Sequence, residues 1–158
     1  MAGQMMLSVG LASRREWRAA RRGVDSEIPK GESVLAEGPG AFLFSDGQMA
    51  MWVEAHIAVT ENRMAWAIPK SPRAGSLSID FDQVVKYLDQ EPGVVALTAR
   101  DPEYAAMLND PTNPHGETDA VFKFDALPSV TSTEIRGYIA SGVAERGTAI
   151  PGSLSDYL

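Results

Sequence analysis

Two side chains that could transfer protons lie two positions apart in an apolar stretch of the sequence. Glu54 and His56 alternate with apolar residues, so both side chains would lie on one face of a strand. A carboxylate beside an imidazole is the minimum needed for general acid–base catalysis. No nucleophile in a recognisable local motif accompanies them, and a solvated strand face is the alternative interpretation. We therefore expect no catalytic residue and no enzyme, and keep Glu54 and His56 as candidate ligand-binding residues.

Basic side chains outside the N-terminus are few. Lys70 and Arg73, together with Lys30, form the one cationic cluster in the sequence after residue 23. They could bind a single anion, and a scattered set of solvated cations is the alternative. Lys70 and Arg73 are therefore candidates for an anion site.

The most polar run follows residue 108. Within it, Asp110, Asn113, Glu117 and Asp119 offer the oxygen ligands that calcium prefers. Their spacing is not that of an EF-hand, and Asn and Pro are also common turn residues. The four residues are candidate metal ligands in a loop that could equally be a flexible connection. We expect no cofactor, and a small metal-dependent or acid–base enzyme is the third hypothesis.

The composition fits one soluble globular domain. The chain has 158 residues, a mass of 17.0 kDa and 44% hydrophobic residues, enough to bury one core without disulfide or metal staples. It has no cysteine, which excludes disulfides, thiol catalysis and cysteine-bound clusters. A net charge of −7 argues against nucleic acid as a partner, because phosphate contacts require a basic surface.

A basic N-terminal arm precedes an acidic body. Residues 1–23 carry five arginines and one glutamate, whereas the residues that follow carry nine basic and twenty acidic side chains. Ser13 and Glu16 have the spacing of a capping box, and Gly23 is typical of the residue just past a helix end. This pattern predicts a short helix over 14–22.

The arm has two interpretations. It could bind an anionic membrane surface or a partner, with Trp17 as its apolar anchor and five cations: Arg14, Arg15, Arg18, Arg21 and Arg22. It could instead be a solvated leader or a strap packed on the domain. Its positive charges follow a short apolar stretch, the reverse of a secretory signal. We expect a cytoplasmic protein, peripheral to the membrane if the arm binds lipid.

The rest of the chain predicts a strand meander followed by a helix. Polar residues with Pro and Gly indicate a linker over 24–33 and a loose tail over 148–158, in which Leu154, Tyr157 and Leu158 could dock. Alternation and turn residues predict strands over 34–37, 41–45, 48–60, 63–68, 76–81, 94–99 and 119–124, a short piece over 82–88, and helices over 102–108 and from Thr131 to Gly147. The expected fold class is mostly β (α+β), a curled antiparallel sheet or small barrel of about seven strands capped by a C-terminal helix.

The strand over 48–60 has two different faces. One is wholly apolar and is predicted to face the core: Met49, Met51, Val53, Ala55, Ile57 and Val59. Further residues predicted to face inward are Met64, Trp66, Leu77, Ile79, Phe81, Ala120, Phe122, Phe124, Ile135, Tyr138, Ile139 and Val143. The other face of 48–60 is mixed and carries Trp52. An exposed tryptophan there would mark a contact patch, so Trp52 is a candidate binding residue.

Two stretches resemble pleckstrin-homology-like domains, including the bacterial and GRAM subtypes. The stretch from Ile57 to Trp66 runs from an apolar strand through Thr60 into a strand that begins with Arg63, and Ser78 to Val84 joins an apolar strand to acidic residues and a valine. With the strand order and the last helix, the resemblance spans 33–147, so 34–147 is the expected domain.

The resemblance implies a non-catalytic binding module. Phosphoinositide-binding members place Lys and Arg around the loop joining their first two strands. Here the connection Glu37–Gly40 and the turn Ser45–Gln48 carry no cation, although a phosphate cage needs several charged donors. We therefore expect a protein partner or self-association. Peripheral membrane association through the arm is the alternative.

Overall fold

The computed structural model describes residues 12–45, 49–69, 76–90, 93–124, 130–146, 150–151 and 157. The helices are α1 (Arg14–Glu27), α2 (Pro102–Leu108), α3 (Val130–Arg146) and the short 3-10 helix η2 (Phe81–Gln83). The strands are β1 (Val34–Ser45), β2 (Ala50–Thr60), β3 (Arg63–Ala67), β4 (Ser76–Asp80), β5 (Val84–Gln90), β6 (Val94–Arg100), β7 (Glu117–Lys123) and β8 (Ile150–Pro151).

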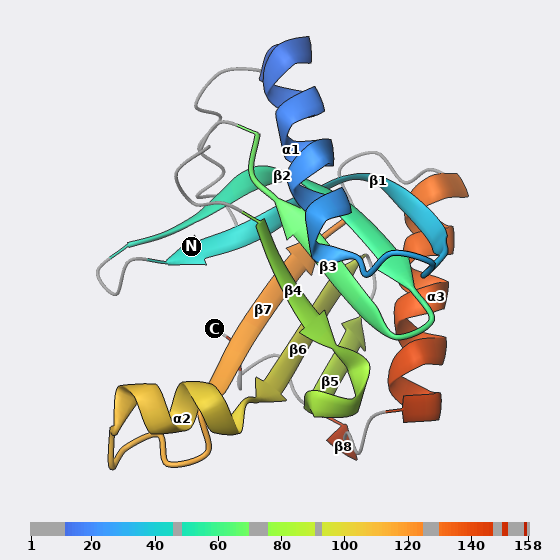
Figure 1. Ribbon diagram of the computed structural model, residues 1–158. Coiled ribbons are helices and arrows are strands. Elements are labelled where there is room, and N and C mark those ends of the chain that lie inside the picture. Colours follow the sequence, from blue (N-terminus) through green and yellow to red (C-terminus); the bar gives the residue numbers. More distant parts are fainter. Residues whose placement is uncertain are drawn as a thin grey trace.

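The strands form one curled sheet in the order β4-β3-β2-β1-β7-β6-β5-β8 (Figure 1). All pairs from β4 to β5 are antiparallel, and β8 adds to β5 in parallel. β1 pairs with β2 along its whole length and with β7 only at Ala41 and Phe42, so it joins the two halves of the sheet. β4 and β8 are the edges of this open sheet. The expected mostly β, α+β architecture with a C-terminal helix is confirmed.

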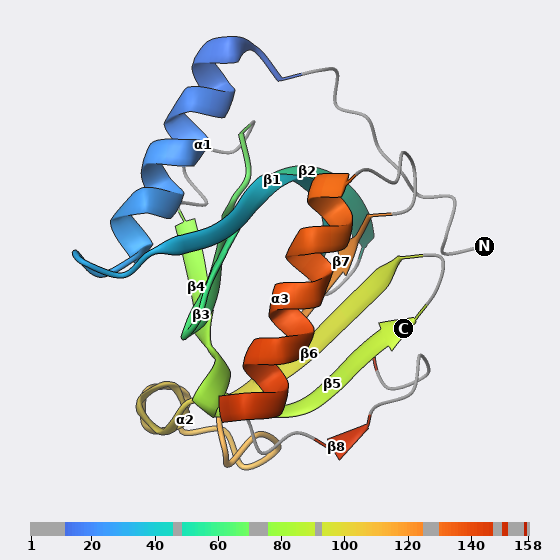
Figure 2. The same ribbon diagram turned by 90° about the vertical axis from the view of Figure 1, so that its right-hand side faces the viewer.

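The main core lies between the inner face of the sheet and α3 (Figure 2). Ile135, Ile139 and Val143 of α3 are buried there. Phe42, Trp66 and Phe122 form an aromatic group whose ring centroids lie 5.1–5.5 Å apart. Ten predicted inward positions in and next to the strands are confirmed as buried: Ala55, Ile57, Val59, Met64, Trp66, Ile79, Phe81, Ala120, Phe122 and Phe124.

Three of the inward predictions are wrong. Met49 is 52% exposed just before β2 begins, and Leu77 is 47% exposed on the edge strand β4. Tyr138 is 39% exposed on α3. Period-2 and period-3.6 patterns identify a face, but they do not say whether a neighbouring element reaches that point to cover it.

Gly38, Pro39 and Gly40 do not end the first strand as predicted, because β1 continues through them to Ser45. A Cβ at Gly38 would lie 2.7 Å from Thr131 Cγ2, and one at Gly40 would lie 2.7 Å from Ile57 Cδ1. The glycines allow close packing against α3 and the core, and they do not form a turn. The predicted short segment 82–88 forms part of the 3-10 helix η2 and most of the seven-residue strand β5.

α1 is longer than predicted. The capping box is confirmed, with Glu16 N donating to Ser13 Oγ over 3.1 Å and Ser13 N donating to Glu16 Oε1 over 2.9 Å. The helix passes Gly23, whose Cβ position would meet Ser76 Cβ at 3.4 Å, and ends at Glu27. Glu27 accepts hydrogen bonds from the Ser76 and Ser78 hydroxyls, so contacts with β4 hold the last turn in place. α3 begins at Val130, one residue before the predicted start at Thr131.

Candidate functional site

His56 contacts the carboxylate of Glu37, and not that of Glu54, its neighbour in the sequence. Its Nε2 lies 3.1 Å from Glu37 Oε2 on β1, while Glu54 is exposed. The register pairs Glu37 with Ala58, which places Glu37 diagonally across from His56. Glu37 Oε1 also accepts a hydrogen bond from Arg21 Nη2 over 2.9 Å. The imidazole therefore belongs to a chain of contacts that links α1, β1 and β2, and a ligand-binding role for Glu54 and His56 stays a prediction.

Glu32 ties the segment after α1 to the turn between β2 and β3. Its carboxylate accepts hydrogen bonds of 2.8 Å from Thr60 Oγ1, Asn62 Nδ2 and Arg63 Nε. Burial opposes ionisation of Glu32, but the hydrogen bonds from Arg63, Asn62 and Thr60 outweigh it and lower its pKa to about 2. The hydrogen bond to Glu32 and the nearby charge of Asp80 raise the pKa of Arg63. This network stabilises the fold.

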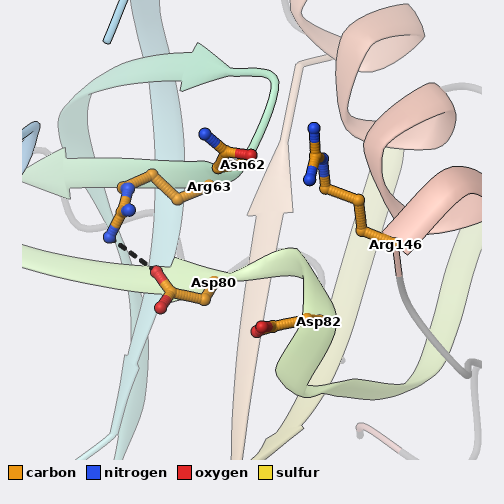
Figure 3. A pocket seen from close by; sticks show the side chains of 5 residues that line it. All are labelled: Asn62, Arg63, Asp80, Asp82 and Arg146. Atoms are coloured by element: carbon orange, nitrogen blue, oxygen red, sulfur yellow. Dashed lines mark hydrogen bonds and ion pairs between the residues drawn. The ribbon is translucent and has the colours of Figure 1, made fainter. Parts of the chain in front are cut away.

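An open recess of about 190 Å³ lies beside this network (Figure 3). Asn62, Arg63, Asp80, Asp82 and Arg146 line it, from the β2–β3 turn, β3, β4, η2 and the end of α3. Arg63 Nη1 donates to Asp80 Oδ1 over 2.7 Å, so that arginine already has carboxylate partners. Because two arginines face two aspartates with no apolar wall, the recess does not favour a particular ligand.

The candidate metal ligands of the polar loop point to different partners. Asp110 accepts from the backbone and side chain of Thr112, and Asn113 pairs with the backbone of Glu117. The Glu117 carboxylate accepts from Arg100 Nε over 2.9 Å, and Asp119 lies on β7. Within the described part of the chain, no group of three or more His, Asp or Glu is arranged to hold a metal ion. Lys70 and Arg73 lie outside the described residues, so the anion site stays a prediction.

α1 has a basic face and a buried face. Ala20 and Val24 pack against Ala58, Ala65 and Ala67 on the outer face of the sheet, away from α3. The arginines are exposed: Arg14, Arg15, Arg18, Arg21 and Arg22. We call these five residues the basic face of α1. The arm is thus packed on the domain as a strap, one of the two alternatives. Trp17 is half-buried and does not project as a free anchor.

A second apolar surface lies beside α1 on the outer face of the sheet. Its buried centre is Trp52, Ala96 and Val121, and its partly buried rim is Ala41, Leu43, Leu88 and Val94. We call these seven residues the outer apolar face. Trp52 is only 7% exposed, with Lys123 Nζ 5.6 Å from its ring centroid, so the expectation of an exposed tryptophan is wrong. Trp52 of β2 shares this cluster with Ala96 of β6 and Val121 of β7.

Tyr157 packs against the outer apolar face and makes a polar contact within it. Its hydroxyl lies 3.0 Å from Thr98 Oγ1, and Thr98 Oγ1 lies 2.7 Å from Asp119 Oδ1. Thr98 Oγ1 is thus within hydrogen-bond distance of both Asp119 Oδ1 and the Tyr157 hydroxyl, and its single proton serves one of these two acceptors at a time. Thr98 is 4% exposed, so this hydrogen bond is shielded from water.

The C-terminal strand β8 pairs with the edge of β5 that faces away from β6. Ile150 and Pro151 of β8 pair with Lys86 and Tyr87, at the edge nearest the outer apolar face. We call Ile150, Pro151 and Tyr157 the C-terminal strap. Ile150 and Pro151 contact β5 through backbone pairing, and Tyr157 contacts β6 through Thr98.

The sequence contained a signal for this site that periodicity alone did not reveal. Val94 to Ala99 is apolar at nearly every position, which is typical of a strand buried on both faces. Thr98 is the single polar residue of that run. A hydroxyl inside a strand buried on both sides needs a hydrogen-bond partner, and Asp119 and Tyr157 provide it.

A scan against protein-family models gave no match, and neither did a search of curated proteins. Among solved structures, the chain is similar to the C-terminal domain of an unknown protein from Leishmania infantum, at 8% identity and a TM-score of 0.46. The match covers 78% of this chain and 94% of that one.

Within the described residues, no helix is long and apolar enough to cross a bilayer.

Proposed function

We propose that this protein is a non-catalytic, pleckstrin-homology-like binding module that engages a protein partner, or a second copy of itself, through the outer apolar face. The resemblance in sequence is one support. The antiparallel order from β4 to β5, followed by a C-terminal helix on the inner face, is the arrangement that the resemblance implies.

The observation that carries the proposal is how the sheet is covered. α3 packs on its inner face and α1 on one part of its outer face. Over the outer apolar face, the described residue that packs is Tyr157, which belongs to neither a helix nor a strand. The centre of this face is buried, and its partly exposed rim of Ala41, Leu43, Leu88 and Val94 is the apolar surface that a partner would contact.

The separation of the candidate catalytic residues supports a binding role over an enzymatic one. His56 lies with Glu37 and Arg21 beside α1, and its side chain is 12% exposed. Glu54 is exposed without reaching it, and the acids of the polar loop are engaged in separate contacts. General acid–base chemistry needs its groups within reach of one reacting atom.

The experiment is site-specific photo-crosslinking in cells that express the full chain. A photoreactive amino acid replaces Leu43 or Leu88 on the rim, and Leu77, an exposed leucine on β4, is the control position. We expect a discrete protein adduct from the two rim positions only. Mixing differently tagged chains identifies an adduct with a second copy. Equal adducts from all three positions, or none from the rim, would contradict the proposal.

Peripheral membrane association is a second candidate, favoured by the basic face of α1. Ala20 and Val24 are buried against the sheet, so the helix cannot insert an apolar side and would bind by charge alone. Such binding requires anionic lipid and weakens with salt.

The test is flotation with vesicles of phosphatidylcholine, with and without phosphatidylserine. We expect flotation only with the anionic vesicles, release by salt, and loss of binding in the triple variant Arg15→Glu, Arg18→Glu and Arg22→Glu. Lys30→Glu changes an exposed cation outside α1 and serves as the control. Flotation of the triple variant equal to that of the wild type would refute this second function.

A further inference from the structure

The basic face of α1 has an acidic counterpart at the opposite end of the molecule. Residues 100–117 carry four carboxylates and a single arginine or lysine, Arg100. We call the four carboxylates around α2 the acidic end: Asp101, Glu103, Asp110 and Glu117. We propose that two copies of this chain form a dimer in which the basic face of each copy docks on the acidic end of the other. This contact goes beyond the proposed function, because it does not use the outer apolar face.

Four of the five arginines on the basic face are available for a partner. Arg21 donates to Glu37 over 2.9 Å, whereas the other four pair with no carboxylate among the described residues. Ala20 and Val24 hold the opposite side of α1 on the sheet, so the arginines face solvent. A guanidinium group can donate two parallel hydrogen bonds to one carboxylate. The basic face therefore suits a surface that presents several carboxylates.

The fold gathers the acidic end around α2. Asp101 caps this helix, and its backbone N donates to Gly116 O over 3.2 Å, so the loop after α2 folds back on the start of the helix. The register of β6 and β7 pairs Arg100 with Glu117, and Arg100 Nε donates to that carboxylate over 2.9 Å. Glu103 is exposed in the first turn of α2. One arginine does not neutralise four carboxylates, so this end keeps a negative charge.

Two exposed apolar side chains lie beside the acidic end. Met107 and Leu108 end α2 and are 74% and 40% exposed. Adjacent exposed apolar side chains are typical of contact surfaces. The hydrocarbon stems of arginine can pack on such side chains while the guanidinium groups reach nearby carboxylates. The contact then has an apolar centre and a charged rim, the usual arrangement of a protein interface.

The positions of α1 and α2 determine which copy supplies each surface. Figure 1 and Figure 2 both show α1 at the top and α2 at the bottom of the molecule. The basic face therefore does not reach the acidic end of its own chain. Two copies that lie side by side in opposite directions bring each α1 to the α2 of the other, and both contacts form in one closed dimer.

The net charge of −7 opposes the association of two copies. This repulsion acts over long distances and is screened beyond about 8 Å at physiological ionic strength, whereas charges in direct contact are screened less. We expect a dimer at about 0.15 M salt and dissociation toward about 1 M, where contacts between exposed charges are screened as well. A variant that loses carboxylates only at the acidic end has less net repulsion but fewer contacts, which separates the two effects.

The experiment is sedimentation velocity of the full-length protein over a range of concentrations at about 0.15 M salt. Arg18→Glu with Arg22→Glu reverses part of the basic face, and Glu103→Lys with Glu117→Lys reverses part of the acidic end. Each double variant alone should associate at least about tenfold more weakly than the wild type, since like charges then face each other. Mixing the two double variants in equal amounts should restore the dimer, because each reversed surface meets a complementary one in the heterodimer. If Glu117→Lys impairs folding, Glu103→Lys alone keeps the test, with Arg18→Glu as its complement.

The matched control is Glu61→Lys with Glu145→Lys, which changes two exposed glutamates outside the acidic end. It moves the net charge from −7 to −3, as the acidic-end variant does, and should associate at least as well as the wild type. Met107→Ser removes an exposed apolar side chain from the centre of the contact and should weaken the dimer several-fold. Circular dichroism checks that each variant is folded.

A wild type that stays monomeric across the range, a mixture no better than the separate variants, or a control as weak as the acidic-end variant would overturn the inference. A monomeric wild type that floats with anionic vesicles would assign the basic face of α1 to a membrane instead. The adducts from Leu43 and Leu88 do not depend on this contact. Their loss would reject the proposed function and leave the dimer standing, whereas loss of the dimer with the adducts retained would reject only the inference.

Discussion

The contacts of the Glu32 carboxylate predict how the free energy of unfolding depends on pH. Glu32→Gln preserves the shape of the side chain but removes the negative charge that lies 2.8 Å from Arg63 Nε. It also weakens the hydrogen bonds that Thr60 and Asn62 donate to this side chain. The Glu32 side chain is 12% exposed and that of Arg63 is 20% exposed, so solvent screens the pair only in part.

The magnitude follows from the pKa of Glu32. A fall from the ordinary 4.5 to about 2 corresponds to at most roughly 3 kcal/mol, since one pKa unit is about 1.4 kcal/mol. Partial screening of the pair lowers the expectation to about 2 kcal/mol lost from the free energy of unfolding at neutral pH.

The sign of the pH dependence is fixed by the direction of the shift. The pKa of Glu32 is lower in the folded than in the unfolded protein, so its stabilisation is fully present above the unfolded value of 4.5 and is lost as the pH falls to about 2. The difference between wild type and Glu32→Gln should therefore shrink across that window. Glutamine does not titrate, and the other carboxylates titrate alike in both proteins.

The assay is urea unfolding followed by tryptophan fluorescence, at neutral pH and at several values within the window. Glu54→Gln, which changes an exposed glutamate of β2, is the matched control and should stay within about 0.5 kcal/mol of the wild type. A difference between wild type and Glu32→Gln that does not change with pH, or one no larger than the control's, would refute the reasoning.

Three further substitutions test packing and capping by urea unfolding. Gly142→Ala should lower the free energy of unfolding by about 1–3 kcal/mol, because the new Cβ would overlap the ring of Phe81. Its control is Gly137→Ala in the same helix, where a Cβ meets nothing within 4 Å and should raise the free energy of unfolding by up to about 1 kcal/mol. Equal effects of the two substitutions would contradict the packing argument. Ser13→Ala should cost about 1 kcal/mol through loss of the α1 cap, and no measurable change would mean that the capping box does not stabilise the protein. Val24→Ala should cost about 2 kcal/mol and increase proteolysis near α1, whereas a neutral effect would mean that α1 is not held by its buried side.

Local features were predictable because their causes lie within a few residues. The capping box of Ser13 and Glu16 formed as its spacing indicated. So did the helix 102–108, where Asp101 caps the N-terminus by accepting from Glu103 N over 3.0 Å. Strand β3 lies within its predicted range, and the middle of β2 faces the core as its alternation indicated.

Features that depend on distant segments were not predictable in this way. Gly38 and Gly40 suggested a turn, but their small size is needed for close packing with Thr131, Ile57 and Phe124. Gly23 suggested a helix end, but contacts with β4 carry α1 four residues further, to Glu27. A glycine has several uses, and only the neighbouring elements determine which one applies.

The sequence by itself determined the fold class, the amphipathic strands and the acidic body with its basic arm, because composition and periodicity are properties of the chain alone. Only the tertiary structure decided that His56 pairs with Glu37, that Trp52 is covered, and that Tyr157 meets Thr98. These contacts join residues 19 and 59 positions apart or depend on strands that the curl of the sheet brings together. The physical reason is that strand register and sheet curvature set the neighbours of each side chain, and both are settled by how all the elements pack at once.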